Sequence, residues 1–488
     1  MMEKKGKKLI LGISLFVAAI ATAFAQTPSR TAYFLDGYDF RHQLNPAIQS
    51  PRSYFSLPVL GNTNVDVQSN LGVDRILFPL GDGYLTTFMS GTVPSDRFLG
   101  RLRRNNVTTA DLSVSLLSVG IWDRSDRSFT TVDVGLKADV SANLPYSLFS
   151  FLKEAGNHEH YEISNLAARA TSYFSIALGE SYRLDENLTV GGKFKFLLGL
   201  ADVNLAVKKL NVDMTRESWS IESHASFRES SCGLINIPTY GDIDPEAENP
   251  DELYYEGINL NTVGSVIGGY GAAIDLGAVY TGLIDGLTLS ASVLDFGFIR
   301  WKSSLNAATY GNTWTYEGFD DFSLNSESAN SFQNQLDDIL NDIEDLARVY
   351  RQDYSGAYTH MLAATILLGV RYDMPFYRNL SAGALVTTHI DGIYSWCEGR
   401  VSANLAIGNW FGLALSYGLS NFGSSLGSAV NFHCTGLNLY FGMDTIPLCY
   451  TAALPDLGIG LPLKKAKVNC NFGLAFNVSN RLDHSAKF

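Results

Sequence analysis

The sequence has little continuous hydrophobicity, because glycine, serine, asparagine and threonine interrupt every apolar stretch after residue 25. A membrane-spanning helix needs about 20 consecutive apolar residues, so we expect none in the mature chain. What is missing elsewhere is charge: residues 401–443 contain no Asp, Glu, Lys or Arg. Such a stretch is unusual on a soluble surface, but it is typical of strands that alternate lipid-facing residues with small polar ones.

The N-terminus carries the one long apolar run. Four lysines between residues 4 and 8 precede the apolar residues 9–20, and Ala23-Phe24-Ala25 then forms an A-x-A cleavage site. An uncleaved anchor would need a longer run, whereas this arrangement is that of a secretory signal peptide. We therefore expect residues 1–25 to be a signal peptide that is removed on export.

Basic charge and paired cysteines are also lacking. The net charge is −13, which argues against a nucleic-acid partner, because such partners require a concentrated positive field.

An odd number of cysteines in an exported chain leaves at least one unpaired, and none has C-x-x-C spacing. We favour isolated buried thiols over a loop disulfide for the five cysteines, which are Cys232, Cys397, Cys434, Cys449 and Cys470.

Alternating polarity with a period of two marks the strands. Between residues 188 and 200, Phe194 and Phe196 share one face with leucines, while Lys193 and Lys195 occupy the other. Lysines opposite a purely apolar row belong in a lumen, because the apolar row faces lipid. A soluble β-sandwich has the same alternation in one strand, but about a dozen such strands with nearly uncharged outer rows favour a barrel.

Residues 268–301 predict a transmembrane hairpin that turns at Ile284-Asp285-Gly286. Its parity shifts at Asp295, and its small inward residues, which include Gly277, could leave room for a plug or a ligand. The same parity argument over several strands predicts lumen-facing charged residues, which either contact a ligand or pair with each other and fasten a plug. They are Asp133, Lys137, Asp139, Lys193, Lys195, Asp275 and Asp295, with Arg371 as a further candidate.

Connections of two lengths alternate along the chain, as they do between periplasmic turns and extracellular loops. Long ones are expected at 143–170, 229–267, 301–358 and 444–464. We predict an all-β, antiparallel, up-and-down transmembrane barrel of about 14 strands, or 16 if residues 201–227 form two more spanning strands. Amphipathic helices are expected in the loops, at 331–350 over the mouth and at 145–155 as a shorter lid or a rim element.

Residues 26–60 have prolines and no strong periodicity, so they would sit in the periplasm or inside the barrel. At this point the chain resembles a known family, through LNPA at 44–47, YF at 54–55, PVLG at 58–61, GAAIDLG at 271–277 and SVLDFGFIRW at 292–301. It is similar to an uncharacterised family of outer-membrane barrels of Gram-negative anaerobes. That family is itself similar to the long-chain fatty-acid transporters (FadL) and to the PorV shuttle protein of type IX secretion.

The resemblance implies a plug inside the barrel. In the fatty-acid transporters an N-terminal Asn-Pro-Ala segment closes a 14-stranded barrel, so Asn45, Pro46 and Ala47 would belong to a hatch. The expected organisation is a signal peptide at 1–25, a hatch at 26–60 and a barrel at 61–488. The resemblance names no substrate, because a shared fold does not transfer function.

No catalytic or metal-binding pattern stands out. The sequence has no G-x-S-x-G elbow and no H-E-x-x-H motif. His158-Glu159-His160 lacks a third metal ligand, and the acidic residues 242–252 do not match a calcium loop and are better explained as a solvated surface. We therefore expect no enzymatic activity, no cofactor and no metal.

The function that we expect is that of an outer-membrane barrel, resembling the fatty-acid transporters, that binds or passes a hydrophobic or amphipathic small molecule. The alternative is a PorV-like interaction protein that holds a secreted protein through its loops at 229–267 and 301–358. In both cases the membrane lipid is a partner. The two hypotheses differ in the lumen, where transport requires a cavity and interaction requires only a filled barrel.

Overall fold

The computed structural model describes residues 29–478, apart from 59–60, 82–83, 155–156, 215–217, 231–234, 237–258, 261–266, 310–311, 317–349, 352–355, 378, 409, 435, 447–449, 455–458 and 463–466. The expected signal peptide, the acidic loop at 242–252 and all but the last residue of the expected helix at 331–350 lie outside these residues. So do Cys232 and Cys449. Cys397, Cys434 and Cys470 are free thiols, but the expectation that they are buried is wrong for Cys397 and Cys434, which are exposed.

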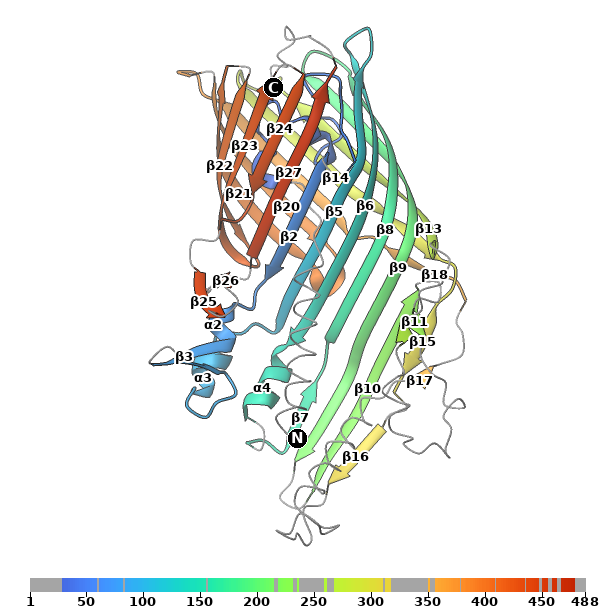
Figure 1. Cartoon of the computed structure of the whole chain (residues 1–488), viewed down its shortest axis with the longest axis vertical. Coiled ribbons are helices and arrows are strands. Elements are labelled where there is room, and N and C mark those ends of the chain that lie inside the picture. Colours follow the sequence, from blue (N-terminus) through green and yellow to red (C-terminus); the bar gives the residue numbers. More distant parts are fainter. Residues whose placement is uncertain are drawn as a thin grey trace.

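Within the described residues, fourteen antiparallel strands close into one barrel (Figure 1). Each strand pairs with the next along the wall, and β27 closes the ring on β2 through pairs such as Val65↔Cys470. The strands are β2 (Asn62–Ser69), β5 (Asn105–Trp122), β6 (Ser128–Pro145), β8 (Leu166–Arg183), β9 (Leu188–Met214), β13 (Gly269–Tyr280), β14 (Leu287–Trp301), β19 (Ala364–Asp373), β20 (Leu380–Ile390), β21 (Trp396–Ile407), β22 (Phe411–Ser420), β23 (Gly423–Cys434), β24 (Leu437–Met443) and β27 (Lys467–Asn477).

The predicted count of 14 strands is confirmed, and the alternative of 16 is wrong. Beyond the barrel, β9 continues and pairs with β10 (Trp219–Ser230), which extends the sheet and does not enter the closed ring. The short strand β1 (Tyr54–Phe55) pairs with both β27 and β5, as β2 does. The expected boundary between hatch and barrel, residue 60, falls between β1 and β2.

The wall separates an apolar outer face from a polar inner face, as alternation along each strand requires. On β9, Phe194 and Phe196 are 56% and 43% exposed, whereas Lys193 and Lys195, which alternate with them, are buried. Leu178 on β8 and Leu276 on β13 belong to the same exposed apolar belt. This surface suits contact with lipid chains.

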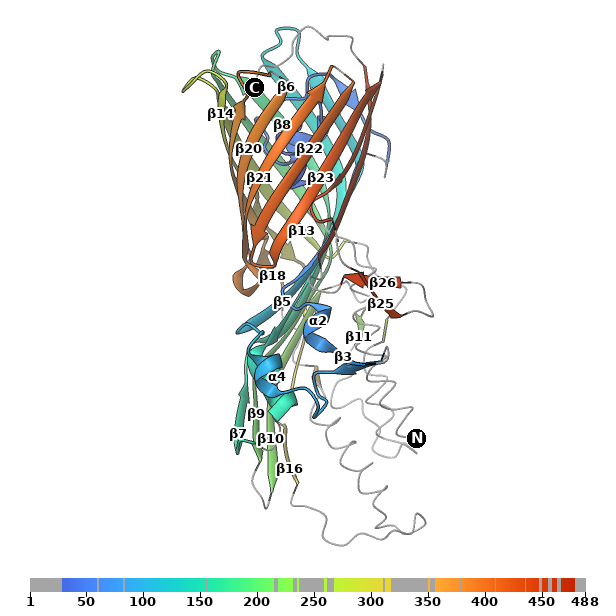
Figure 2. The same ribbon diagram turned by 90° about the vertical axis from the view of Figure 1, so that its left-hand side faces the viewer.

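The two ends of the barrel differ, as Figures 1 and 2 show. The connections between β5 and β6, β8 and β9, and β13 and β14 are short and lie at one end, which we call the turn end. At the other, the loop end, β5, β6, β8 and β9 run on past the barrel together with β10 (Figure 1). This extension also includes β7 (His160–Ile163), β15 (Leu305–Ala308), β16 (Asn312–Tyr316), β17 (Tyr350–Arg351) and β18 (Tyr358–Met361).

A small lobe at the loop end was not predicted from the sequence. Its aromatic core stacks Phe88 on Phe98, with ring centroids 4.3 Å apart, and sets Phe149 edge-on against both. Phe149 belongs to α4 (Tyr146–Glu154), which confirms the helix expected at 145–155. The lobe also contains α2 (Val73–Ile76), β3 (Leu77–Gly81), β4 (Tyr84–Thr87) and α3 (Ser95–Leu99).

Other short elements are β11 (Ile235–Asn236), β12 (Asn259–Leu260), η4 (Gly392–Tyr394), β25 (Tyr450–Leu454) and β26 (Ile459–Pro462). In the described part of the chain, helices are short, and none has the length and apolar character to cross a bilayer.

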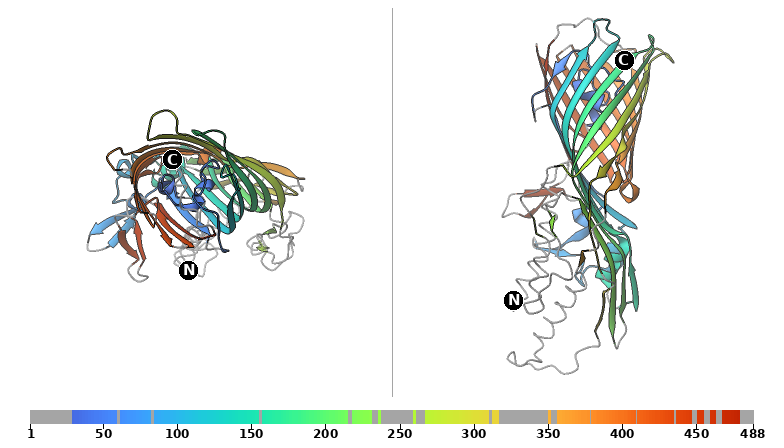
Figure 3. Two further views of the ribbon diagram at one scale, coloured as in Figure 1. Left: turned by 90° about the horizontal axis from the view of Figure 1, so that it is seen from above. Right: turned by 90° about the vertical axis from the view of Figure 1, so that its right-hand side faces the viewer.

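Residues 29–53 lie inside the barrel and form the segment that we call the hatch (Figure 3). It contains two short 3₁₀ helices, η1 (Arg30–Ala32) and η2 (Asp39–Gln43). Its aromatic side chains pack on the wall: the Tyr38 ring lies 4.0 Å from that of Tyr440 on β24, and Phe34 packs in one buried cluster with Leu367 and Leu385. The hatch thus shares its core with the barrel.

Candidate functional site

The Asn-Pro-Ala turn of the hatch sits in a dent made by two glycines. Gly191 on β9 and Gly277 on β13 are direct cross-strand partners. A Cβ atom at Gly277 would lie 2.0 Å from Asn45 Oδ1, and one at Gly191 would lie 2.3 Å from the Pro46 carbonyl carbon. Only glycine leaves space for this backbone approach, so the pair defines where the turn can lie.

Asn45 fixes the turn through hydrogen bonds. It is fully buried, and its Nδ2 donates to the carbonyl oxygen of Ala291 at 3.2 Å and to Tyr33 Oη at 3.1 Å. Its Oδ1 accepts from the Ala47 amide at 3.0 Å, closing the turn around Pro46. Asn45, Pro46 and Ala47 therefore all lie in the lumen.

Ion pairs also fasten the N-terminal part of the hatch. Asp36 receives a bidentate pair from Arg371 on β19, with Nη1 and Nη2 at 2.6 and 2.7 Å from its oxygens. Arg30, which is 2% exposed, lies 3.3 Å from carboxylate oxygens of Asp66, Glu398 and Asp444. Arg371 thus holds the hatch in this structure.

The middle of the hatch holds a buried carboxyl that accepts hydrogen bonds from neutral groups. Asp39 accepts hydrogen bonds from Ser50 Oγ and from Asn438 Nδ2, both at 2.6 Å. Burial disfavours its charged form and raises the pKa of Asp39 to about 6.

His42 connects the hatch to the charged wall. Its Nε2 lies 3.2 Å from Asp133 on β6, and Asp133 also pairs with Lys193 on β9 at 2.7 Å. Ser118 Oγ donates to the same carboxylate at 2.7 Å. Asp133 and Lys193 therefore join two wall strands to the hatch.

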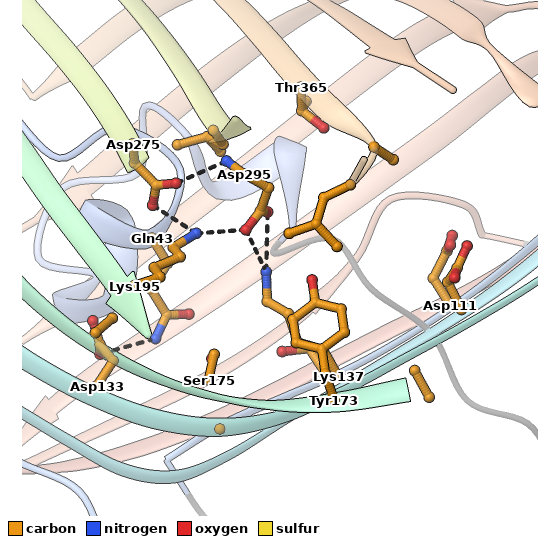
Figure 4. Close-up of a pocket in the computed structure, with 18 of the residues that line it drawn as sticks. Gln43, Asp111, Asp133, Lys137, Tyr173, Ser175, Lys195, Asp275, Asp295 and Thr365 are labelled. Carbon is orange, nitrogen blue, oxygen red and sulfur yellow. Dashed lines mark hydrogen bonds and ion pairs between the residues drawn. The ribbon is translucent and has the colours of Figure 1, made fainter. Parts of the chain in front are cut away.

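A second cluster of wall charges surrounds a β-bulge on β14. Asp295 has a positive φ of 56°, and the pairing of β13 with β14 shifts register there, which confirms the parity shift predicted at this residue. The bulge turns the Asp295 carboxylate inward beside Asp275, whose Oδ1 accepts from the Asp295 amide at 2.8 Å. Two lysines neutralise the pair: Lys195 lies 2.7 Å from both carboxylates and Lys137 lies 3.0 Å from Asp295 (Figure 4).

The last predicted wall charge, Asp139, pairs with a residue that the sequence reasoning did not single out. Arg169 on β8 lies 3.2 Å from Asp139 and also binds Asp391, through Nη1 at 2.7 Å from Oδ1. Every predicted lumen residue thus has an ionic partner on the lumen side of the wall. The charges fall into separate groups, centred on Asp133, on Asp295 and on Arg169.

These groups line a cavity between the hatch and the loop end. The cavity volume is about 130 Å³, and the cavity opens to solvent. Gln43 and Leu44 of the hatch border it at one side, and His360 and His389 line it near the strand ends that carry long connections. Apolar residues contribute as well, among them Tyr173, Leu294, Leu362 and Leu367. We call this cavity the chamber.

The metal hypothesis gains no support from the geometry. His160 pairs with Asp213 on the exposed part of β9 at 2.5 Å, and the described residues include no cluster of three or more His, Cys, Asp or Glu side chains suited to a metal ion.

Several lumen residues escaped the sequence reasoning. Asp66 and Asp111 lie on strands with clear alternation, NVDVQS and TADLSVS. This alternation predicts that their side chains point into the lumen. Arg30, Asp36 and His42 belong to the irregular hatch, where periodicity gives no direction. Their partners are distant in sequence, and only the folded chain reveals them.

Fold and lumen together define a closed, plugged transmembrane β-barrel with a mixed polar and apolar chamber. The chain belongs to a family of unknown function, DUF5723, whose family model matches residues 46–444. A search of curated proteins finds no match.

Among solved structures, the chain is similar to several transport barrels at low identity. The Pseudomonas putida toluene transporter TodX has 11% identity and a TM-score of 0.37, over 94% of this chain and 96% of that one. The Ralstonia pickettii toluene transporter TbuX has 7% identity and a TM-score of 0.39, over 94% and 98%. A Pseudomonas aeruginosa FadL homologue has 12% identity and a TM-score of 0.36, over 93% and 98%. The fold assignment made above depends on strand register alone.

Proposed function

We propose that this protein is an outer-membrane barrel that takes an amphipathic small molecule into its chamber and passes it inward when the hatch moves. The observation that carries this is the chamber itself, a cavity of about 130 Å³ bordered by the hatch and lined by both charged and apolar side chains. A wall lined only by ion pairs would suit a filled barrel, and a wholly apolar cavity would suit a hydrocarbon. A mixed lining favours a ligand with a polar head and an apolar body.

The orientation follows from the connections. Short turns face the periplasm and long connections face outward in outer-membrane barrels, so the chamber would open toward the cell exterior and the hatch would close the periplasmic side. The signal peptide expected at 1–25 would deliver the chain to the envelope. No step of this proposal requires catalysis or a cofactor.

The alternative, a barrel that holds a secreted protein, depends on loops at 229–267 and 301–358. Most residues of these loops lie outside the described ranges, and no described contact favours that function. We therefore argue the ligand-binding function alone.

Binding can be tested by filling the chamber from the wall. Ala177 on β8 lines the chamber and is buried, whereas the next residue, Leu178, is 61% exposed on the outer face. Ala177→Trp should weaken binding of octanoate or octan-1-ol at least roughly tenfold, because the indole occupies the space of the ligand, and Leu178→Trp should leave it unchanged. Isothermal titration calorimetry of the purified chain in a nonionic detergent measures both. Heat-dependent gel mobility checks that each variant is folded, and Thr365→Trp serves as a second filling variant. Equal binding by wild type and both filling variants would overturn the proposal.

Passage can be tested by locking the hatch. A chain without its native cysteines and with Thr31→Cys and Ser416→Cys places two thiols where the hydroxyl oxygens of Thr31 in the hatch and Ser416 on β22 are 2.8 Å apart. The oxidised lock should retain chamber binding and block ligand-dependent conductance in planar bilayers, and reduction should restore it. Each single-cysteine variant is the control. Conductance that does not change with oxidation would contradict a moving hatch.

A further inference from the structure

The lobe at the loop end is rich in arginine, although the chain as a whole is acidic. Residues 70–104 contain five arginines and three aspartates, whereas the net charge of the chain is −13. Half of the residues from 97 to 104 are arginine. The chain therefore concentrates guanidinium groups at one place outside the barrel. The five residues are Arg75, Arg97, Arg101, Arg103 and Arg104.

Two of these arginines fasten separate segments of the lobe to each other. Arg75, on α2, donates from Nη1 to the Arg101 carbonyl oxygen at 2.7 Å. Arg101 in turn donates to Asp74, to its carboxylate at 2.6 Å and to its carbonyl oxygen at 3.3 Å. These contacts hold the chain after α3 against α2, and they keep both arginines on the same part of the lobe.

The next two arginines are held at the start of β5 by their backbone. Asn106 accepts from the Arg103 amide at 3.2 Å and donates to its carbonyl oxygen at 3.0 Å, and the Tyr146 amide donates to the Arg104 carbonyl oxygen at 2.9 Å. The side chains of Arg103 and Arg104 are exposed. In the part of the chain that the structure describes, no carboxylate pairs with either of them, and Asp74 is already paired with Arg101.

The arginines also repel one another. Burial lowers the pKa of the Arg75 guanidinium; Asp74 opposes this shift, and the positive charges of Arg101 and Arg103 lower the pKa further. Like charges held close together cost free energy unless an anion joins them. An anion bound here would therefore relieve the repulsion as well as form its own hydrogen bonds.

This group of arginines lies just outside the rim of the barrel. β2 ends where Ser69 pairs with Thr108 on β5, and Arg104 lies four residues before Thr108, which is roughly 13 Å of extended chain. Figure 1 places α2 and α3 beyond the loop end of the wall. In the orientation proposed above, this end faces the cell exterior, where the outer leaflet consists of lipopolysaccharide with phosphate groups on its lipid A and core.

We propose that Arg103 and Arg104, with Arg75 and Arg101 beside them, bind phosphate groups of lipopolysaccharide at the outer rim of the barrel. This inference goes beyond the proposed function, because it depends on the orientation of the barrel but on neither the chamber nor a movement of the hatch. Guanidinium groups suit phosphate, since their N–H groups form paired, charge-assisted hydrogen bonds with its oxygens. Basic side chains next to a membrane surface also gain from the charge of anionic lipids. Such binding would hold the lobe against the membrane surface.

A lipid titration of the full purified chain in a nonionic detergent, followed by native mass spectrometry, tests this. The two probes are lipid A with both phosphate groups and lipid A from which both have been removed. Wild type should bind the phosphorylated lipid at least roughly tenfold more tightly, and the double variant Arg103→Gln, Arg104→Gln should lose this preference. The control variant Arg124→Gln, Arg127→Gln removes two exposed arginines at the turn end and should retain it.

Heat-dependent gel mobility checks that both double variants are folded. Equal binding of the two lipids by wild type would overturn the inference without any variant. A preference that survives in Arg103→Gln, Arg104→Gln would mean that other groups bind the phosphate, and a preference lost in both double variants would mean that only the overall charge matters; either result contradicts the inference. If an equimolar amount of inorganic phosphate displaces the lipid, the site is one for free phosphate and the inference is wrong. The test uses no chamber ligand, so its result is independent of the proposed function.

Discussion

The half of the lumen that the hatch fills and the chamber both hold polar groups at membrane depth, but they satisfy these groups in different ways. Where the hatch lies on the wall, glycines such as Gly191 and Gly277 let its backbone approach, and neutral groups satisfy the buried Asp39. In the chamber no backbone covers the wall, and Lys137 and Lys195 neutralise the carboxylates of neighbouring strands. Polar groups at membrane depth need either close packing or a partner of opposite charge.

Under the proposed function, this difference indicates which part of the lumen would bind the ligand. A wall that is already covered by the hatch has no surface to offer, while paired charges around an open space leave both polar and apolar surface accessible. The hatch half therefore closes the barrel, and the chamber half is the part that can recognise a molecule. Three changes test that division, each aimed at one half.

The largest expected effect comes from the chamber. Lys195→Met removes the cation that lies 2.7 Å from both Asp275 and Asp295. Breaking a buried ion pair by removing one partner typically costs about 3–5 kcal/mol, because the remaining charge stays buried. We expect a loss of that order in the free energy of unfolding, measured by urea titration of the barrel in lipid vesicles.

A surface lysine provides the matched control. Lys209 lies 3.9 Å from Glu222, and both are about half exposed, so Lys209→Met should change the unfolding free energy by about 0–1 kcal/mol. Adding Asp275→Asn to Lys195→Met should recover part of the loss, since it removes an uncompensated carboxylate. Equal effects of the two lysine substitutions would mean that the chamber charges are solvated like surface ones.

Much of this division could be read from the sequence, and the reason is alternation. Lys193 and Lys195 alternate with Phe194 and Phe196 in a strict period of two, so the lumen face and the strand count followed from local pattern. The shift at Asp295 was visible for the same reason. Local pattern says nothing about partners, however, and the pairs Asp36 with Arg371 and Arg30 with Asp444 join residues more than 300 positions apart.

The lobe at the loop end shows a second limit of prediction from the sequence. Residues 70–102 contain short elements and an aromatic core formed with Phe149 of a distant helix. No segment of the lobe is long enough to display a clear period, so propensity and spacing gave no signal. The hatch was placed by resemblance through Asn45, Pro46 and Ala47, while its path along the wall depended on glycines that look like ordinary strand residues until the turn is docked.

A smaller effect is expected from pH in the hatch half. Because the pKa of Asp39 is raised to about 6 by burial, the folded chain holds a proton that the unfolded chain releases near pH 4. The folded state therefore binds more protons between these values, and stability falls as pH rises from about 4 to about 6, by roughly 3 kcal/mol in all. Above that range the loss is complete and the contribution is flat.

Asp39→Asn isolates this effect from other titrations. The amide keeps an oxygen that can accept from Ser50 and carries no charge, so the difference between wild type and variant should change between pH 4 and 6 and stay constant above. Thermal unfolding of both proteins across this range gives the comparison. A difference that is independent of pH would mean that Asp39 is not the buried carboxyl that titrates.

The smallest expected effect comes from a substitution in the glycine dent. It tests whether this dent alone holds the hatch in place. Val at position 191 would place Cβ 2.3 Å from the Pro46 carbonyl carbon, whereas at Gly192, which faces outward, the nearest atom would be 3.9 Å away. Overpacking of this kind costs about 1–3 kcal/mol, and because Val suits a strand, Gly191→Val should keep the barrel folded and displace the hatch. Gly192→Val adds the same atoms to the same strand but makes no contact with the hatch.

Trypsin should therefore cleave the hatch at Arg41 or Arg52 in the first variant and not in the second, with unchanged heat-dependent gel mobility of both. Cleavage in both variants would mean that any loss of glycine from this strand releases the hatch, whether or not it contacts the hatch. Cleavage in neither would mean that Asp36 and Arg371 hold the hatch without the dent.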